Sequence, residues 1–459
     1  MFSLNKTKRT AINLIVDLVL ADTKAYIKRT IVDCSIAIDG SKILKIGKET
    51  NMPQADTKMD LKRLLVLPGL IDAHVHLRDE GKAYKEDFHS GTAAAAAGGI
   101  ATVFDMPNNA PVTMNTEALR NRMKIAESKI LVNVGFYSEF PKDIQEIEGI
   151  VSHGAVGFKL FMAEQIGGLD IHDDQALMQA FKSVTKLSRL TAAHAEDEAS
   201  LKRAEDNLKR NGRNDVTAFL KAHSEEVEVK AVERLLNIES KAGIRLHFCH
   251  VSTENGLERI VEAKKSGMPV TCETTPHHLF LSAEDLKRIG ASALTMPPVR
   301  GKNHIAALWS GIRNGSIDII ASDHAPHTIE EKEAQSIWDV KAGIPGLETT
   351  LSLMLTEVKH GRLTIGDLVR LTSENPAEIF RLKGRGSLNE GNTADLTVVD
   401  LGRKYKIDSS LFHSKAKYSP FDGRTVEGKA SKTFVNGQLI MDEDEIVAKP
   451  GSGEIIRGN

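Results

Sequence analysis

Short apolar runs alternate with longer amphipathic stretches through the middle of the chain, from residue 66 to residue 384. The longer stretches, such as NTEALRNRMKIAESK and EVEVKAVERLLNIESKAG, carry charged residues at helical spacing and predict helices. The apolar runs predict eight strands: LVLPGLIDAHVHL, IATVFDMP, ILVNVGFY, AVGFKLFM, LTAAHAE, IRLHFCHV, MPVTCETTP and IDIIASDHAP. Eight strands that alternate with helices over about 320 residues favour an α/β fold, a (β/α)8 TIM barrel, whose usual size of about 250 residues grows with insertions.

Both ends of the chain are rich in β-branched residues with partial alternation. Residues 1–65 contain NLIVDLVLAD, AYIKRTIVDCSIAIDG and KILKIGKE, and residues 385–459 contain TADLTVVDL and SKTFVNGQLIM. The Asn-Gly pair in FVNGQ is the strongest two-residue hairpin signal. We therefore predict a small β-sandwich domain built from the N- and C-terminal segments, with the barrel at 66–384 between them. A doubly wound open sheet is the alternative for the middle segment, but no GxGxxG turn follows an early strand.

Composition limits the partners and the compartment. The chain has 459 residues, of which 41% are hydrophobic and 27% charged, and its formal net charge is -2. This balance suggests neither a nucleic-acid surface nor an anionic membrane as a partner. The three cysteines, Cys34, Cys249 and Cys272, form no CxxC pair, which fits a reducing cytoplasm. The run AINLIVDLVLA contains Asp17 and is far shorter than the roughly 20 residues of a membrane span, so we expect a strand there.

Metal-competent and ionisable side chains follow the apolar runs at their C-terminal ends. In a barrel these ends meet on one face, where active sites are built. His74 and His76 are two residues apart on a strand, so they project the same way and can chelate one ion. Strands four, five, six and eight would supply the others: Lys159, His194, His250 and Asp323. Each residue alone is weak evidence, but together they predict a metal site.

Each of these residues also has a purely structural interpretation. An HxH pair can be a hydrogen-bonded core pair, His194 and His250 can be satisfied core histidines, and Asp323 can cap a helix. Lys159 alone would be a surface or ion-paired lysine, but its apolar neighbours in GFKLFM argue against exposure. His247 lies three residues before His250, so we expect it on the opposite face of the strand in a structural role.

The chemistry of this set suits hydrolysis at two divalent metal ions. Histidines supply neutral nitrogen ligands and Asp323 an oxygen, but two cations also need a shared anion. The neutral amine of Lys159 can react with carbon dioxide to form a carbamate bridge, and burial favours that neutral form. Two metals about 3.5–4 Å apart can hold a bridging hydroxide as nucleophile and polarise a carbonyl. Asp323 can pass the proton of that hydroxide to a leaving nitrogen.

The motifs PGLIDAHVHLR, GTAAAAAGG, DMPNNAPVT, GFKLFM, VTCETTPHHLFLS, ASDHAPHT and GIPGLETTLSLML resemble those of the dihydroorotase family in the amidohydrolase superfamily. The resemblance covers nearly the whole chain. It implies a TIM barrel with a β-sandwich from both termini, two Zn2+ ions, and reversible cyclisation of N-carbamoyl-L-aspartate to dihydroorotate in pyrimidine biosynthesis. In the family pattern, His74, His76 and Asp323 hold one zinc, His194 and His250 hold the other, and carboxylated Lys159 bridges the two. Asp323 is also the general acid and base in that pattern.

Other residues must choose the substrate, because related enzymes share the metals. Dihydroorotate carries a carboxylate outside its ring, and a guanidinium pairs with a carboxylate in a bidentate way. The resemblance assigns that carboxylate to Arg78 of HLR, Asn108 of MPN and His327 of SDHAPH. The structural alternative for Arg78 is a salt bridge with Asp79 or Glu80.

Two other kinds of function compete with this interpretation. An allantoinase or a hydantoinase (dihydropyrimidinase) would share the metal site, but HLR combined with MPN argues against both. A non-catalytic scaffold of the same fold would not need the intact set of ligands. The expected partner is the small-molecule substrate, and the resemblance allows a homodimer and association with aspartate transcarbamoylase, which some family members show.

Some positions stay open at this point. Met296 stands where many relatives have a polar residue able to touch the substrate ring. Glu273 and His277 are similar to residues that bind an extra zinc in some relatives, but a supporting role is favoured here. Residues 162–174 contain two glycines and are predicted to form a mobile loop over the substrate.

Overall fold

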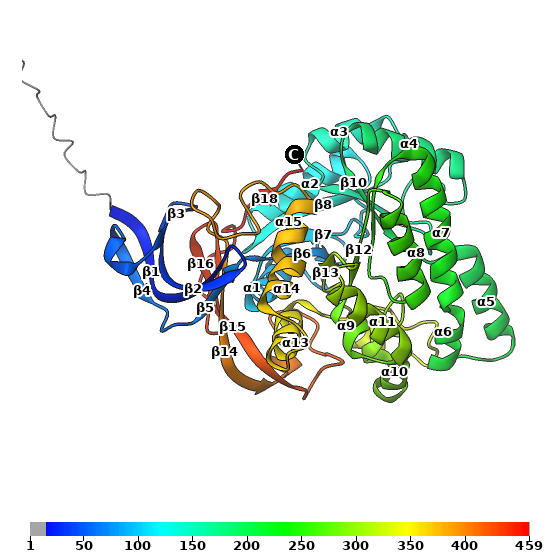
Figure 1. The fold of residues 1–459 in the computed structure, drawn as a ribbon. Helices are drawn as coiled ribbons and strands as arrows, with labels where there is room; N and C mark the ends of the chain where they lie inside the picture. The colour runs from blue at the N-terminus through cyan, green and yellow to red at the C-terminus, as the bar shows by residue number, and fades with distance from the viewer. Residues whose placement is uncertain (1–14, 459) are drawn as a thin grey trace, which may run out of the picture.

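The computed structural model of this protein describes residues 15–458. Its central element is a barrel of eight parallel strands in chain order (Figure 1). These strands are β6 (Leu70–Val75), β7 (Ile100–Asp105), β8 (Asn133–Glu139), β9 (Gly157–Phe161), β10 (Leu190–His194), β11 (Arg245–Phe248), β12 (Val270–Thr274) and β13 (Ile319–Ile320). The barrel closes where Val75 bridges His324, just beyond β13. The predicted (β/α)8 fold is confirmed.

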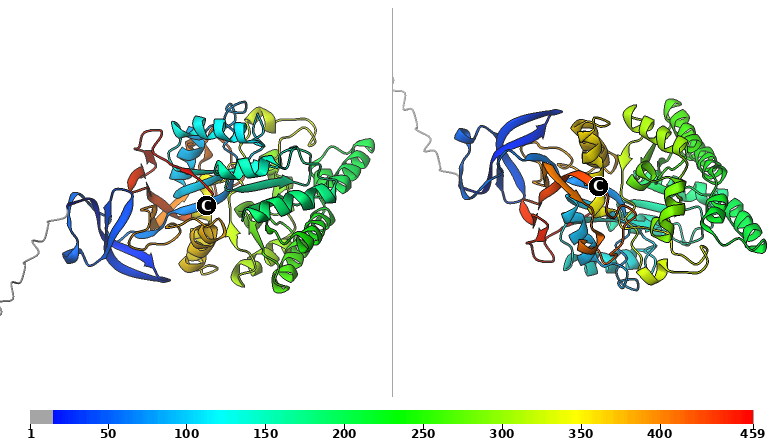
Figure 2. Two further views of the ribbon diagram at one scale, coloured as in Figure 1. Left: turned by 90° about the horizontal axis from the view of Figure 1, so that it is seen from above. Right: turned by 90° about the horizontal axis from the view of Figure 1, so that it is seen from below.

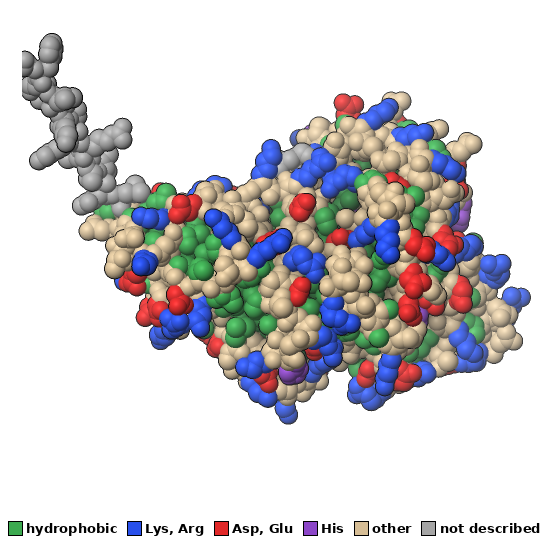
Figure 3. Space-filling view, in the orientation of Figure 1, with side chains coloured by type: hydrophobic (Ala, Val, Ile, Leu, Met, Phe, Trp, Pro, Cys, Tyr) green, Lys and Arg blue, Asp and Glu red, His purple; other side chains and the backbone are tan. Residues whose placement is uncertain are grey.

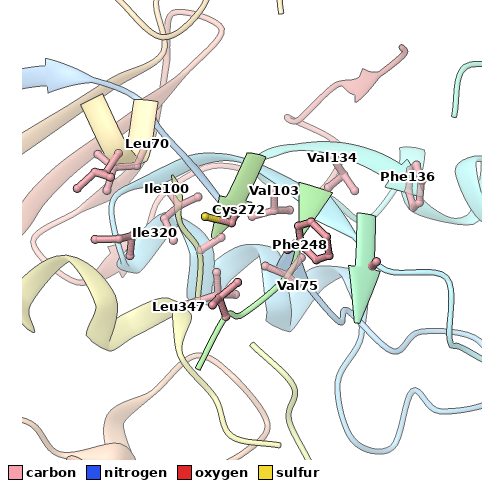
Figure 4. Close-up of a cluster of buried hydrophobic side chains, with 14 of the residues drawn as sticks. Leu70, Val75, Ile100, Val103, Val134, Phe136, Phe248, Cys272, Ile320 and Leu347 are labelled. Atoms are coloured by element: carbon pink, nitrogen blue, oxygen red, sulfur yellow. The ribbon is translucent and has the colours of Figure 1, made fainter. Parts of the chain in front are cut away.

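The barrel strands separate two buried apolar layers. Outward side chains such as Val134 and Phe248 pack in a cluster with helix residues (Figure 4). The inner layer contains Phe380, whose ring lies against Phe104 and Tyr137 at centroid distances of 4.6 and 6.1 Å. Burial of both faces is typical of parallel strands covered by helices. Because aromatic rings fill part of the interior, the barrel has a packed core.

Helices cover the outside of the barrel (Figures 1 and 2). Several begin at a side chain that accepts a backbone N–H of the first turn, as Asn115 does for α2 and Thr253 for α8. Their bounds are α1 (Phe88–Ala97), α2 (Thr116–Glu127), α3 (Glu146–Ser152), α4 (Asp174–Lys186), α5 (Glu198–Arg210), α6 (Val216–Ala222), α7 (Glu225–Ala242), α8 (Glu254–Lys265), α9 (Pro276–Phe280), α10 (Ala283–Ile289), α11 (Lys302–Arg313), α12 (Ile329–Lys332), α13 (Leu347–Lys359), α14 (Ile365–Val369) and α15 (Asn375–Ile379).

Strands from both ends of the chain form a second sheet beside the barrel (Figures 1 and 2). Its order is β17-β16-β15-β14-β5-β1-β2-β3, with β4 paired parallel to β1 and most other pairs antiparallel. The bounds are β1 (Ile15–Ile27), β2 (Thr30–Asp39), β3 (Lys42–Gly47), β4 (Gln54–Asp60), β5 (Leu65–Pro68), β14 (Leu396–Lys406), β15 (Thr425–Val435), β16 (Gln438–Asp442) and β17 (Glu445–Ile446). The predicted β-structure from both termini is confirmed, although the part of AINLIVDLVLA before Ile15 lies outside the described residues.

The last strand, β18 (Ile455–Ile456), returns to the barrel and runs parallel to β8. Ile455 pairs with Val134 and Ile456 with Gly135, whereas β9 pairs with β8 only from Tyr137 onward. The strand therefore occupies the part of the β8 edge that β9 leaves free.

The surface carries both charge signs. Figure 3 shows Lys and Arg side chains mixed with Asp and Glu over the face in view, in keeping with the net charge of -2. Within residues 15–458, every helix is too short or too polar to serve as a transmembrane span.

The turn between β15 and β16 packs against the turn between β2 and β3, so it brings together segments from the two ends of the chain. This contact provides a test of the sheet. The turn between β15 and β16 contains the predicted Asn-Gly pair, and a Cβ on Gly437, at φ +82°, would lie 2.2 Å from the carbonyl oxygen of Gly40. We expect Gly437→Ala to lower the free energy of unfolding by roughly 3 kcal/mol, because left-handed strain of about 1–2 kcal/mol adds to displacement of the Gly40 turn. Gly40 has φ +54°, and nothing lies within 4 Å of the place that a Cβ would take, so Gly40→Ala should cost only about 1 kcal/mol of strain. Urea unfolding measures both, and equal losses would contradict a tight contact between the two ends.

Candidate active site

The C-terminal ends of the barrel strands surround a cavity of about 600 Å³. Lys159 lies on β9 and His194 ends β10, whereas His250 and Asp323 follow β11 and β13. These are strands four, five, six and eight of the barrel, as predicted. All nine residues singled out from the sequence line this cavity: His74, His76, Arg78, Asn108, Lys159, His194, His250, Asp323 and His327.

His74, His76 and Asp323 form a cluster of buried donor atoms. The Nε2 atoms of both histidines lie 3.3 Å from Oδ1 of Asp323. On the edge of each ring that faces away from Asp323, Nδ1 of His74 is 2.5 Å from Oε1 of Glu273, and Nδ1 of His76 is 2.7 Å from Oδ1 of Asn108. Because these acceptors hold the proton on Nδ1, each Nε2 lone pair is left for the cavity. Burial lowers the pKa of His74 and of His76, which favours the neutral imidazole that a metal requires.

His194 and His250 form a second pair of imidazoles. Nδ1 of His194 lies 3.1 Å from Nε2 of His250, and Glu196 holds Nε2 of His194 at 2.8 Å. Burial lowers the pKa of His250 well below its ordinary value. Among residues 15–458, Nδ1 of His250 has no hydrogen-bond partner. Two imidazole nitrogens therefore meet at a separation that suits two ligands of one cation.

Lys159 is completely buried in the wall of the same cavity. Its amine donates to Sγ of Cys249 at 3.0 Å and lies 5.0 Å from the centre of the Phe161 ring. Its hydrogen-bond partner is thus a thiol and not a carboxylate. The alternative of an exposed lysine is wrong.

Three residues of the site have left-handed backbone conformations. The φ angles are +35° for His250, +47° for Asp323 and +61° for Arg78. Non-glycine residues pay of order 1–3 kcal/mol for such conformations, which persist where the surrounding structure fixes them.

Asp323 does not cap a helix, because Thr328 caps α12, so that structural alternative is wrong. Burial raises the pKa of Asp323, although His74 opposes the shift.

Arg78 presents an incompletely paired guanidinium to the cavity. Its Nη2 lies 3.4 Å from Nε2 of His327, and its buried Nε has no hydrogen-bond partner among the described residues. The alternative of a salt bridge with its neighbours in sequence is wrong. Asp79 pairs with Lys129 at 2.8 Å, and Glu80 lies 3.7 Å from Arg122.

A lysine and a glutamate surround the other side of the His327 ring. Nδ1 of His327 lies 3.1 Å from Nζ of Lys85 and 3.0 Å from Oε2 of Glu331. Burial, together with the charges of Arg78 and Lys85, lowers the pKa of His327. This shift favours the neutral imidazole, which carries one ring proton.

The sequence model of the amidohydrolase family matches residues 65–440, which is most of the chain. This chain belongs to the amidohydrolase family. It is 37% identical to a dihydroorotase from Methanosarcina acetivorans and 38% identical to one from Pyrococcus horikoshii, each over 96% of both chains. It is also 33% identical to an L-hydantoinase from Paenarthrobacter aurescens, over 96% of this chain and 98% of the relative. The predicted resemblance to dihydroorotases is confirmed.

A solved structure supports the same fold assignment for this amidohydrolase. The L-hydantoinase (dihydropyrimidinase) from Arthrobacter aurescens matches with a TM-score of 0.93 and 32% identity, over 96% of this chain and all of the other. The family and its dihydroorotase relatives support a hydrolase that acts on cyclic amides and takes a small-molecule substrate.

Family membership implies a metal, and the residues of this amidohydrolase fit one. His74, His76 and Asp323 offer ligand atoms that lie within 4.8 Å of one another, and all three side chains are buried. The ring nitrogens of His194 and His250 that meet at 3.1 Å, and the outward-held Nδ1 protons of His74 and His76, agree with a set of ligands prepared for a cation. The structure therefore contains a candidate metal centre.

The placement of His247 differs from the prediction. His247 was expected on the opposite face from His250, but its Nε2 lies 3.1 Å from Glu273, the carboxylate that also holds His74. The count of alternating residues fails because β11 ends at Phe248 and His250 has a left-handed backbone. His247 thus supports the site from the inner side of the barrel.

The structure also describes the surroundings of Met296, His277 and the segment 162–174, whose roles the sequence left open. Met296 lines the cavity, whereas His277 is buried with its Nε2 unpaired among the described residues. In the segment 162–174, Ala163 and Glu164 line the cavity. The rest of that loop is fastened by Gln165, whose side-chain amide donates to two backbone carbonyls of the same loop at 2.8 and 2.6 Å.

Sequence reasoning missed the residues that support the predicted ones. Glu196, Lys85 and Glu331 each hold a ring nitrogen of a predicted histidine. Glu196 stands two residues after His194 at the end of β10, a spacing that could have found it, whereas Lys85 lies at no strand end. One signal was available for Glu331. Thr328 and Glu331 stand three residues apart, as in a capping box, and the structure shows that box at the start of α12.

The carboxylate of Glu273 gives a test of the metal centre. We expect Glu273→Ala to weaken the binding of the first divalent cation about 10–100-fold, because Nδ1 of His74 loses the acceptor that orients its ring. Competition between the protein and a chelator for Zn2+ measures this affinity. Glu239→Ala is the control, since Glu239 is also buried but lies on α7 outside the cavity. Unchanged zinc affinity in Glu273→Ala, or the same loss in both variants, would contradict the orienting role.

Proposed function

We propose that this protein is a dihydroorotase, which interconverts N-carbamoyl-L-aspartate and dihydroorotate in pyrimidine biosynthesis. The observation that carries the proposal is the incompletely paired guanidinium of Arg78 beside the neutral ring of His327. A buried charge without a partner is costly, and an anionic group in the cavity would relieve that cost. Dihydroorotate carries such a carboxylate outside its ring, whereas allantoin and simple hydantoins do not.

Asn108 completes the proposed carboxylate site. Its Oδ1 accepts from Nδ1 of His76, so its amide nitrogen is left to donate to the substrate. Arg78 supplies charge and His327 a neutral ring next to it. The same asparagine thus links the carboxylate site to a metal ligand, which fixes the substrate ring relative to the reacting centre.

The metal site is proposed to hold two Zn2+ ions. His74, His76 and Asp323 would hold one, and His194 and His250 the other, with Lys159 carboxylated as the bridge. Bound divalent cations would supply Lewis acidity toward the amide carbonyl and the attacking water. The full burial of Lys159 in the wall of this cavity supports its role as the bridge.

Asp323 is proposed as the group that moves the proton. In the hydrolytic direction, water adds to the ring carbonyl and the ring C–N bond breaks. Asp323 takes a proton from the attacking water and delivers it to the leaving nitrogen, and the steps reverse for cyclisation. The raised pKa of this buried carboxyl supports such a role, because it brings the acid form closer to neutral pH.

The setting of the enzyme is part of the proposal. We propose a cytoplasmic location, which the three free cysteines Cys34, Cys249 and Cys272 support. We also propose domain limits at 1–65, 66–384 and 385–459. A homodimer and association with aspartate transcarbamoylase stay predictions.

Turnover assays separate the proposed reaction from its neighbours. Purified, zinc-loaded protein is incubated separately with dihydroorotate, allantoin, hydantoin and dihydrouracil, and ring opening is followed for each. We expect turnover of dihydroorotate with a kcat/KM at least about 100-fold above the other rings, since only that ring can pair with Arg78. Turnover of hydantoin or allantoin but not dihydroorotate would favour the competing enzymes. A complete lack of turnover would favour a scaffold.

Arg78→Met tests the carboxylate site directly. Loss of a charge-assisted pair should raise the KM for dihydroorotate about 10–100-fold while metal content stays the same. Lys129→Met is the matched control, because it removes a nearby cation that pairs with Asp79 and does not line the cavity. An unchanged KM in Arg78→Met would show that the carboxylate binds elsewhere.

A further inference from the structure

Lys85, which is buried, and Glu331, which is partly buried, form an ion pair in the lining of the substrate cavity, on the Nδ1 side of His327. Nζ of Lys85 lies 2.7 Å from Oε1 of Glu331, and Lys85 is 7% exposed. Both side chains also reach Nδ1 of His327, at 3.1 and 3.0 Å. The function proposed above gives a role to His327 but none to this pair.

The pair presents His327 with two incompatible partners. A neutral imidazole has one N–H and one lone pair, so Nδ1 can donate to Glu331 or accept from Lys85 but cannot do both. If Nδ1 carries the proton, Nε2 becomes an acceptor and repels a carboxylate in the cavity. If Nδ1 accepts from Lys85, Nε2 carries the proton and can donate to that carboxylate.

We propose that Lys85 is a positioning residue for recognition of the substrate carboxylate: it donates to Nδ1 of His327 and so places the ring proton on Nε2. The inference rests on the function proposed above and deepens it. With that tautomer, Nε2 of His327 and Nη2 of Arg78 are two donors 3.4 Å apart, which converge on a single missing acceptor.

Glu331 can release His327 because other donors satisfy it. Oε2 of Glu331 accepts from the backbone N–H of Thr328 at 3.2 Å, and Oε1 accepts from Lys85 and from the Tyr84 hydroxyl at 3.2 Å. The carboxylate therefore keeps its hydrogen bonds when Nδ1 turns to Lys85. Its role in this arrangement is to hold the ammonium of Lys85 against the imidazole.

Three substitutions at one position separate the hydrogen bond from the charge. Lys85→Met removes both, Lys85→Gln keeps an N–H donor without the charge, and Lys85→Arg keeps both. For dihydroorotate we expect KM to rise about 10–100-fold in Lys85→Met, with kcat changed less than about threefold, because one hydrogen bond to a charged group is lost. The KM of Lys85→Gln should be at least about threefold lower than that of Lys85→Met, and the KM of Lys85→Arg should be closest to the wild-type value.

The control for cavity charge is Lys341→Met. Lys341 also lines the cavity, but it is exposed and its side chain makes no hydrogen bond or ion pair with His327 within the part of the chain that the structure describes. Its removal should change KM less than about threefold. Equal KM values for Lys85→Met and Lys85→Gln, or an equal effect of Lys341→Met, would overturn the proposal in favour of charge alone.

The tautomer itself can be read without turnover. In protein labelled with 15N-histidine and bound to orotate, a flat ring with the same carboxylate, the His327 signal should report a proton on Nε2. That signal is identified by its loss in His327→Gln. In Lys85→Met the proton should move to Nδ1, whereas a merely structural role of Lys85 would leave it in place and overturn the proposal.

The outcomes also separate this inference from the function on which it rests. If the wild type opens dihydroorotate but Lys85→Met keeps the wild-type KM, the positioning role is wrong and the function stands. If the wild type fails to act on dihydroorotate, the proposed function is wrong, and the tautomer measurement alone decides the role of Lys85.

Discussion

Closure of the barrel is the constraint on which the site depends. β6 carries His74 and is followed by Arg78, whereas β13 is followed by Asp323 and His327, so the first and last strands must meet before the site exists. The seam is held by backbone and carboxylate together. The N–H of His76 donates to the carbonyl of His324 at 2.8 Å. The buried carboxylate of Asp72 accepts from the N–H of Ser322 at 3.1 Å.

A second layer of acceptors turns this meeting point into a defined set of ligands. Buried imidazoles have two possible tautomers, and each needs a partner on the side away from the cavity. Glu273 serves His74, and Glu196 serves His194 and also His223. Burial alone would raise the pKa of Glu196, but the two histidines hold it well below its usual range, so this carboxylate stays charged. The protein therefore places fixed charges behind its ligands and keeps the cavity side free for cations and substrate.

The sequence was sufficient for those features that depend on strand order. Lys159 and His194 fall at the expected strands because parallel strands in a barrel present their ends in chain order. The Asn-Gly hairpin was equally predictable from local backbone preference. Prediction failed at His247, where a left-handed residue after the strand broke the alternation. It missed the role of Glu196, because the spacing of two residues from His194 is a local signal, but the contact of Glu196 with His223 depends on how the chain folds.

The place of β18 has a consequence for the order in which the protein can be made. Ile455 and Ile456 complete hydrogen bonding along a stretch of β8 that begins more than 300 residues earlier. During synthesis that edge of the barrel stays unpaired until β18 has left the ribosome. An exposed strand edge is a template for pairing with other chains. Until β18 docks, this edge of β8 is thus open to wrong pairing, and Ile455 and Ile456 cover it.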